Sequence, residues 1–392
     1  MKKTLLASLL AVVAMNANAE LIQHTDQIAE IKFTGTTYEL GKHVGEEGKE
    51  QILAGIQRFD ATLGAMLEGM SVESLSETFK KNHVFANLKK TAPDSAAYIQ
   101  GLSDALNLDP NYLLSIGMSD EAVFESQRSG GLGFLEEGKK KDEAPAKCTV
   151  MGKVDGKGKG WGVANFDYMG INYEGLMYLN HTNEKGETKI VQTWIGLIPY
   201  GGVTAGGQPL LMNTMSDEGT ARQYDNGPIL ADNLVPSYKM SWDVYNAKTP
   251  EEVKEVFDAG PATTYFSYII LDAEKGKVAN VENGYKSDTR FDYAQGMVHS
   301  NHSRFVQHEF VKGAFGGHTV EREQAGQKLL DAHGEGTKFA DVLDTMQSKP
   351  LYKGRGEMIG TVTTIFYDID GKKVDMSIYT DKDHDMVHIK NY

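Results

Sequence analysis

The spacing of apolar residues divides the chain into a helical first third and a later part rich in strands. Between Gly45 and Met70, apolar residues recur every three or four positions, which is the period of one helix face. The apolar positions of this predicted helix are Ile52, Ile56, Phe59, Leu63 and Met66. Further helices are predicted to begin at Pro93 and Pro110, because proline is favoured in the first helical turn.

After Cys148 the apolar period changes to two, which predicts strands. The predicted strands are Trp161–Tyr168, Leu176–Thr182, Lys189–Leu197, Leu210–Met215, Thr264–Leu271, Val278–Val281, Thr361–Ile369, Val374–Tyr379 and Met386–Ile389. A helix interrupts them after Thr249, where Thr-Pro-Glu-Glu combines a capping box with proline at the first helical position. Short turns such as Asp370-Gly371 favour antiparallel pairing. This order of elements predicts an α+β fold in which helices cover antiparallel sheets.

Two segments lie outside this pattern. Residues 1–19 combine two lysines, a short apolar run and the ending Ala-Asn-Ala, which is typical of a signal peptide cleaved after Ala19. That run is too short to span a bilayer, and no later stretch of the sequence is long enough. We therefore expect a periplasmic or secreted protein of a Gram-negative bacterium, without a membrane anchor. Residues 129–147 are rich in glycine and then in charge, which predicts an exposed loop.

Composition argues against several classes of function. The 392 residues include 54 acidic and 40 basic side chains, which gives a formal charge of −14. Nucleic-acid binding needs a basic surface, so we expect none. His181 and His302 do not have the spacing of metal ligands, and the run 156–160 lacks the Ser or Thr of a phosphate-binding loop. We expect no cofactor and no metal, and the oligomeric state stays open.

The single cysteine, Cys148, is the most informative residue. Secreted proteins usually keep cysteines in pairs, because an unpaired thiol there is exposed to oxidation. Cys148 is therefore either an inert buried residue or a nucleophile. It lies where the predicted loop meets the first strand, so cleavage after Lys147 would give it an α-amine with an ordinary pKa of about 7.7–8.0. Such an amine can take the thiol proton near neutral pH without a histidine.

Polar residues further along the chain supply partners for this chemistry. Asn165 and Asp167 lie two positions apart in a predicted strand, so their side chains point to one face. A carboxylate on that face can orient the amine. Asn301 lies in the polar run 299–304 and can donate to a developing oxyanion, a role worth about 2.7–4 kcal/mol.

Several short motifs occur in a fixed order around the cysteine. Cys148-Thr149 is followed by Gly-x-x-Asn-x-Asp, which ends at Asp167. The further elements are Tyr38–Gly41, Ile99–Leu102, Leu211–Asn213 and Asn301-His302. With these motifs the chain resembles the acyl-coenzyme A:isopenicillin N acyltransferase family of self-processing cysteine N-terminal-nucleophile (Ntn) hydrolases. That family is distantly related to choloylglycine and penicillin V hydrolases.

The resemblance implies a four-layer αββα sandwich of antiparallel sheets flanked by helices. Residues 20–147 would form a helical segment released by self-cleavage, and residues 148–392 would form the catalytic chain. The implied reaction is hydrolysis of a linear amide C–N bond in a small N-acyl compound or a peptide. Acyl transfer would be a side activity, because coenzyme A is not expected outside the cytoplasm.

The resemblance also implies roles for individual residues. Cys148 would be the nucleophile and, through its new amine, the base, while Asp167 would hold that amine. Asn165 would shape the site, and Asn301 and Asn213 would serve the oxyanion.

Residues outside this catalytic set are expected to contact the substrate or to mark the cleavage site. Tyr168 and Arg355 are the expected substrate contacts, and the bond between Lys147 and Cys148 is the expected cleavage site.

Departures from the family pattern motivate two alternatives. Lys147 stands where family members often carry a small residue, and Leu211 replaces the first glycine of a Gly-Met-Asn element. The main alternative is a catalytically degenerate or non-enzymatic periplasmic binding protein on the same fold. A third reading is an unprocessed thiol enzyme that uses a histidine base.

Overall fold

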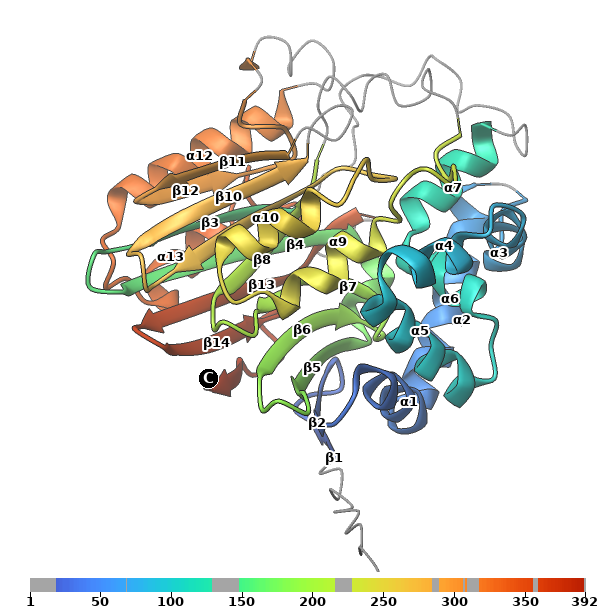
Figure 1. Ribbon diagram of the computed structural model, residues 1–392. Coiled ribbons are helices and arrows are strands. Elements are labelled where there is room, and N and C mark those ends of the chain that lie inside the picture. The colour runs from blue at the N-terminus through green and yellow to red at the C-terminus, as the bar shows by residue number, and fades with distance from the viewer. Residues whose placement is uncertain are drawn as a thin grey trace, which may run out of the picture.

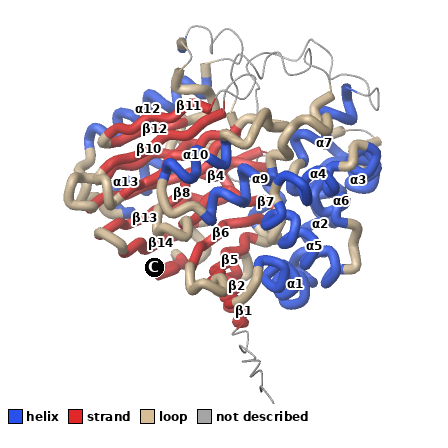
Figure 2. The backbone as a smooth tube through the Cα atoms, in the orientation of Figure 1, coloured by secondary structure: helices blue, strands red, loops and turns tan. Residues whose placement is uncertain are grey.

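Two β-sheets lie face to face and helices cover their outer faces, which makes the four layers αββα (Figure 1, Figure 2). The computed structural model describes residues 19–67, 69–128, 148–215, 228–283, 289–305, 307–308, 317–354 and 359–390. The layered α+β class and the αββα sandwich expected from the sequence are therefore confirmed.

The larger sheet has nine described strands in the order β1-β2-β5-β6-β7-β8-β9-β10-β11. They are β1 (Ala19–Gln23), β2 (Ile28–Thr34), β5 (Leu176–Thr182), β6 (Thr188–Trp194), β7 (Ile198–Val203), β8 (Pro209–Thr214), β9 (Phe266–Asp272), β10 (Lys277–Asn283) and β11 (Thr289–Ala294). Neighbours are antiparallel except β2 and β5, which run parallel. Strands β1 and β2 correct the prediction of a purely helical first third, because pairing with a partner distant in sequence overrides the local helical pattern.

The smaller sheet carries the segment that begins at Cys148. Its described strands, in the order β12-β3-β4-β13-β14-β15, are β12 (Gly296–His299), β3 (Thr149–Val154), β4 (Lys159–Met169), β13 (Ile359–Asp370), β14 (Lys373–Tyr379) and β15 (Val387–Lys390). Side chains alternate along β3 and β4, so Met151 and Trp161 face the helices while Val150 and Phe166 face the other sheet. A Cβ at Gly152 or Gly162 would lie within 2.6 Å of Leu271, so these glycines let the two sheets approach each other.

Helices form two groups on opposite sides of the sheets. The group that packs against the larger sheet is α1 (Thr37–Glu47), α2 (Lys49–Met66), α3 (Val72–Lys81), α4 (Val84–Thr91), α5 (Pro93–Leu106), α6 (Pro110–Gly117), α7 (Ser119–Arg128), α9 (Tyr238–Trp242) and α10 (Pro250–Phe257). The short 3-10 helices η2 (Gly170–Tyr173) and η4 (Asp243–Asn246) contact helices of this group. On the smaller sheet lie α12 (His318–Ala332) and α13 (Phe339–Met346). No described helix is both long enough and apolar enough to cross a membrane.

Local signals place the helix boundaries. Asp109 accepts a hydrogen bond from the backbone of Asn111, and Thr249 accepts one from the backbone of Glu252, so both residues are N-caps. The capping box predicted at Thr249 is only half formed, because the Glu252 carboxylate accepts from the backbone of Lys248. The helix predicted from Gly45 is interrupted at Gly48, where α1 ends and α2 begins.

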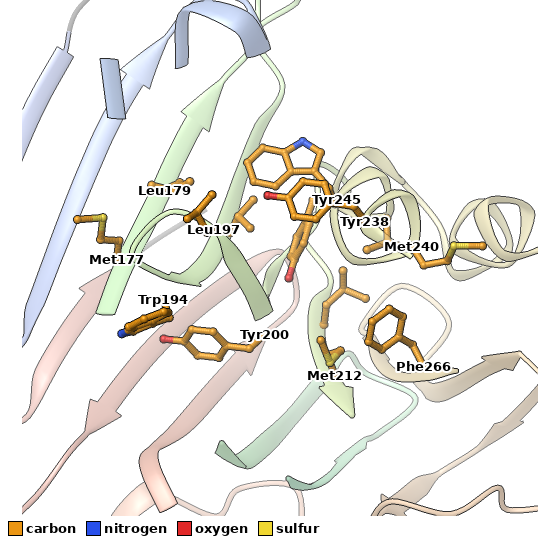
Figure 3. Close-up of a cluster of buried hydrophobic side chains, with 14 of the residues drawn as sticks. Met177, Leu179, Trp194, Leu197, Tyr200, Met212, Tyr238, Met240, Tyr245 and Phe266 are labelled. Atoms are coloured by element: carbon orange, nitrogen blue, oxygen red, sulfur yellow. The ribbon is translucent and has the colours of Figure 1, made fainter. Parts of the chain in front are cut away.

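Aromatic and sulfur-containing side chains fill the core on both faces of the larger sheet (Figure 3), and Tyr200 stacks on Phe166 of the smaller sheet. Trp194 and Tyr200 come from β6 and β7, while Tyr238 and Tyr245 come from the helices that cover them. All four are less than 5 % exposed. Burial of such large side chains is the main term that holds helices and sheet together.

Candidate active site

Cys148 immediately precedes β3 and lies in the apolar core, with 7 % of the residue exposed. Its Sγ is 4.0 Å from the backbone oxygen of Asp167 on the neighbouring strand β4. Burial, together with the charge of Asp167, raises the pKa of the thiol to about 12. The charge of Arg322 acts in the opposite direction. In the intact chain the sulfur is therefore a protonated thiol at neutral pH.

Asp167 presents a buried carboxylate to this position. It is 2 % exposed, and neither of its oxygens accepts a hydrogen bond of good geometry from the described residues. Burial raises the pKa of Asp167 to about 6, although Arg322 and Thr361 act to lower it. Thr361 lies opposite Asp167 on β13, and the pairing slips by one residue directly beyond it. A buried carboxylate without a well-aligned donor is costly, so this site favours an added cation.

Arg322 on α12 connects the backbone of Cys148 with Asn301. Its Nη1 donates to the carbonyl oxygen of Cys148 and to the hydroxyl of Thr149, both at 2.8 Å. Its Nη2 donates to Oδ1 of Asn301 at 2.6 Å. Burial lowers the pKa of Arg322, while Asp167 and Cys148 act to raise it. The two ends of the site are therefore linked through one guanidinium group.

The sequence analysis missed Arg322, although a signal for it exists. Arg322, Gly326 and Leu329 are buried at intervals of four and three residues, so the arginine lies on the apolar face of α12. A long cation on such a face is unusual and indicates a buried anionic or carbonyl partner.

Asn301 is held on both sides of its amide. Oδ1 accepts from Arg322, and Nδ2 donates to the backbone oxygen of Thr214 at 2.7 Å. Because the amide nitrogen carries two hydrogens, one remains uncommitted within the described part of the chain. This geometry fits the predicted oxyanion role, which stays a prediction.

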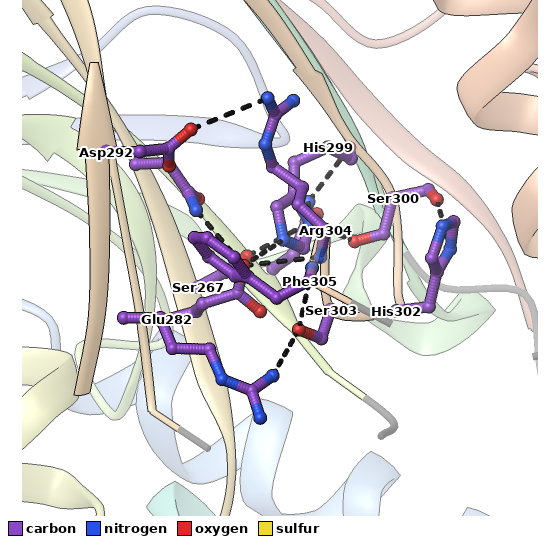
Figure 4. Close-up of polar contacts among 12 residues, drawn as sticks. Ser267, Glu282, Asp292, His299, Ser300, His302, Ser303, Arg304 and Phe305 are labelled. Carbon is purple, nitrogen blue, oxygen red and sulfur yellow. Dashed lines mark hydrogen bonds and ion pairs between the residues drawn. The ribbon is translucent and has the colours of Figure 1, made fainter. Parts of the chain in front are cut away.

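Asn213 is oriented differently. Its Nδ2 lies 3.0 Å from the backbone oxygen and 3.3 Å from Nδ1 of His299. His299 in turn contacts the hydroxyl of Ser267, and Glu282 lies beyond it (Figure 4). One amide hydrogen of Asn213 is thus donated to the backbone oxygen of His299, and the predicted role of Asn213 as a second oxyanion donor stays a prediction.

Asn165 holds the smaller sheet to the helices that cover it. Its Nδ2 donates to the backbone oxygens of Met346 and Leu351 at 2.8 and 2.9 Å, and its Oδ1 accepts from Thr364 at 2.6 Å. Any influence of Asn165 on the site is therefore indirect, through the position of β4.

A pocket opens beside Tyr168, the residue that follows Asp167. Its apolar wall includes Ile198, Met212 and Phe266, and its polar wall includes Glu121. Tyr168 is hydrogen-bonded to Ser119 at 2.9 Å and its ring stacks on Phe166. The pocket meets the site again at Thr214, whose backbone oxygen binds Asn301. The predicted substrate contact Tyr168 therefore lines a pocket.

Glu121 is the ionisable group of this pocket with the largest burial. It accepts hydrogen bonds from the hydroxyls of Ser237 and Thr263. Burial raises the pKa of Glu121 to about 7, despite these hydrogen bonds.

Other predicted positions lie outside the described residues. These are Arg355, Lys147 with the loop 129–147, and residues 1–18 of the predicted signal peptide.

Comparison with known proteins bears on the later part of the chain. Residues 244–383 match the family described as acyl-coenzyme A:6-aminopenicillanic acid acyl-transferase. The match includes Asn301 and Arg322 and begins after Cys148 and Asp167. The predicted family resemblance is confirmed for this part. No curated protein matched the chain.

Three solved structures are similar to this chain. A mutant conjugated bile acid hydrolase from Clostridium perfringens has 12 % identity and a TM-score of 0.42, and the match covers 62 % of this chain and 92 % of that one. Penicillin V acylase from Agrobacterium tumefaciens has 13 % identity and a TM-score of 0.39, with 62 % and 86 % covered. A Caenorhabditis elegans orthologue of N-acylethanolamine-hydrolyzing acid amidase has 14 % identity and a TM-score of 0.40, with 56 % and 92 % covered. At these identities no substrate is carried over.

Proposed function

We propose that the chain is a self-processing cysteine Ntn hydrolase that cleaves the amide bond of small N-acyl compounds. The observation that carries this proposal is the buried carboxylate of Asp167, which acts on Cys148 through its charge and has no well-aligned hydrogen bond from the described residues. An α-ammonium group on Cys148 would supply a cationic donor to it. The same group, as a neutral amine, would accept the thiol proton.

Processing would begin with attack of Cys148 Sγ on the carbonyl carbon of Lys147. The C–N bond before Cys148 breaks, the thiol proton passes to the departing nitrogen, and a thioester to Lys147 forms. Water then hydrolyses the thioester, which leaves a carboxylate on Lys147 and both a thiol and an amine on Cys148. Because β2 pairs with β5, the two resulting chains would stay together in one sheet.

Amide hydrolysis would use the same atoms. The α-amine takes the thiol proton, and Sγ attacks the acyl carbon. The oxyanion then accepts a hydrogen bond from the uncommitted amide hydrogen of Asn301. The leaving nitrogen departs with the proton of the ammonium group, and an acyl thioester remains. Water, deprotonated by the amine, then releases the carboxylic acid and restores the thiol.

The pocket supports an apolar acyl group as the recognised part of the substrate. Ile198, Met212 and Phe266 offer an apolar wall, while Glu121 and Thr214 offer polar atoms on the opposite side. The substrate class we propose is an N-acyl amide with a hydrophobic acyl chain. The pattern of residues 1–19 supports export to the periplasm or beyond.

Incubation with a panel of N-acyl amides tests this function. N-acyl amino acids, acyl-homoserine lactones, bile-salt conjugates and penicillins would be followed by mass spectrometry of the released acid. We expect hydrolysis of at least one class by the wild-type chain and none by Cys148→Ala. Full activity in Cys148→Ala would assign the chemistry to another group, and inactivity of the wild type on every class would favour the binding-protein alternative.

A further inference from the structure

Two histidines and a glutamate converge beside the candidate active site. The ligand atoms of His302, His308 and Glu323 all lie within 4.8 Å of one another. His302 follows β12, Glu323 lies in the second turn of α12, and His308 comes from the segment between them. No step of the proposed hydrolysis uses these residues.

Two ligand atoms of this cluster have no well-aligned hydrogen-bond partner among the described residues. Oε2 of Glu323 lies 3.3 Å from Nε2 of His302 and 2.7 Å from Nε2 of His308. Nevertheless, neither Oε2 of Glu323 nor Nε2 of His302 has an aligned hydrogen-bond partner in the described part of the chain. His302 is only 1 % exposed, so water does not readily satisfy its nitrogen. A metal ion among the three ligand atoms would give both of these atoms a partner.

The second ring nitrogen of His302 is anchored as in metal-binding histidines. Nδ1 lies 3.0 Å from the hydroxyl of Thr319. It also lies 3.2 Å from the hydroxyl of Ser300, a contact that Figure 4 shows. The hydroxyl of Thr319 already accepts from the backbone of Asn301, and that of Ser300 donates to the backbone oxygen of Thr319. This network is satisfied when Nδ1 carries the hydrogen, an assignment that turns the lone pair of Nε2 toward Glu323.

Charge and spacing both suit a divalent cation. The carboxylate of Glu323 supplies negative charge and an oxygen ligand, and the two imidazoles supply nitrogen ligands. Tetrahedral zinc, with bonds of about 2.0–2.1 Å, separates its ligand atoms by about 3.3 Å. The pair His302–Glu323 already has this separation. His308 is 40 % exposed and can move outward by the remaining fraction of an ångström.

We propose that His302, His308 and Glu323 bind one divalent transition-metal ion, of which zinc best fits two imidazoles and a carboxylate, with water as the fourth ligand. Asn301 and Arg322, which are bonded to each other, directly precede His302 and Glu323 in the sequence. An ion at this position would therefore tie the segment 299–308 to α12 next to the bond that orients Asn301.

Zinc binding by the full chain in a Cys148→Ala background tests the proposal, because the thiol is then absent as a ligand. The chain is stripped with a chelator, and zinc is titrated against a chromophoric competitor. We expect one equivalent per chain, weakened at least 100-fold by His308→Ala and by Glu323→Gln. His318→Ala is the matched control, because His318 lies on the same helix, is 59 % exposed and pairs with Glu321; it should bind as the parent does.

Hydrogen exchange adds a readout of position. Zinc should slow exchange in the segment 299–308 of the parent chain and not of His308→Ala. Absence of stoichiometric zinc, or equal binding by all three variants, would overturn the proposal. Since His308 is exposed, its variant decides the question even if Glu323→Gln fails to fold. The assay does not depend on catalysis, so its failure would leave the proposed hydrolase function untouched.

Discussion

The guanidinium of Arg322 donates to the carbonyl oxygen of Cys148 across 2.8 Å, although 174 residues separate the two in the sequence. The same side chain binds Asn301, so the predicted nucleophile and the predicted oxyanion donor share one anchor. A shift of α12 would therefore disturb both ends of the site at once.

Substitution of Arg322 should damage both stability and activity. Arg322→Met leaves the Cys148 carbonyl and Asn301 without their donor, and we expect a loss of about 3–5 kcal/mol in the free energy of unfolding. Arg322→Lys keeps the charge but not the forked geometry, so it should lose less stability and still lower kcat at least tenfold. Denaturant unfolding and steady-state kinetics check this.

Arg58→Met, at the exposed pair with Glu174, is the control, with an expected change under about 1 kcal/mol in the free energy of unfolding. An equal effect at both arginines would contradict the anchoring role of Arg322.

Asp167 should make the unprocessed chain less stable as pH rises. Its folded pKa of about 6 lies above the ordinary value of 3.8, so between these pH values the folded state retains a proton that the unfolded state releases. Stability contributed by the protonated carboxyl is fully present below pH 3.8 and is lost as pH rises through 6. In a Cys148→Ala background, Asp167→Asn should remove this loss, which amounts to at most about 3 kcal/mol. Urea unfolding at pH 4 and pH 7 measures it, and identical pH dependence of the two proteins would argue against a raised pKa of Asp167.

In the processing-competent chain the same substitution should act on catalysis. Asp167→Asn removes the carboxylate that holds the α-amine, and we expect kcat to fall at least about 100-fold. Retention of full activity would show that the amine is positioned by another group.

Glu121 should give the stability of the protein a second dependence on pH. Its folded pKa of about 7 lies above the ordinary 4.5, so its contribution to stability is complete below pH 4.5 and lost as pH rises through 7. Glu121→Gln should therefore stabilise the protein at pH 8 by up to about 3 kcal/mol relative to wild type, and hardly at all at pH 4. Thermal and urea unfolding at both pH values provide the comparison. A stabilisation that is equal at pH 4 and pH 8 would not come from titration of this carboxyl.

Helices α1 and α5 should not tolerate a side chain at their crossing. A Cβ at Gly101 would lie 2.0 Å from the backbone oxygen of Tyr38, so Gly101→Ala must push the helices apart. We expect a loss of about 2–4 kcal/mol in the free energy of unfolding. Gly64→Ala on the exposed face of α2 is the matched control, because its nearest contact is 3.4 Å away; it should be neutral or stabilising by up to about 1 kcal/mol. Similar losses at both glycines would contradict this view of the crossing.

Much of the fold could be predicted because the relevant forces are local. The N-caps at Asp109 and Thr249 depend on residues two or three positions away, and the alternation in β4 follows from burial of its two faces. Strands β1 and β2 could not be predicted in this way. Their place in the sheet depends on pairing of Ile28 with Leu176, and a single sequence holds no local trace of so distant a contact.

The same distinction between local and distant contacts applies to the site. Cys148 and Asp167 are nineteen residues apart and meet through one hairpin, so their proximity follows from the strand pattern. Arg322 and Glu323 lie on α12, which is distant in the sequence from Cys148 and Asp167, so their place in the site could not be predicted. The one signal for them was a buried arginine on the apolar face of a helix. The cluster of His302, His308 and Glu323, which we propose as a metal site, could not be predicted because its spacing in the sequence matches no standard motif.

Intact-mass analysis of the purified protein under denaturing conditions tests the central claim most directly. Wild-type protein should give two polypeptides, the second beginning at Cys148, while Cys148→Ala should give one uncleaved polypeptide. A single uncleaved polypeptide from active wild-type protein would contradict the claim that the nucleophile gains its base from its own α-amine.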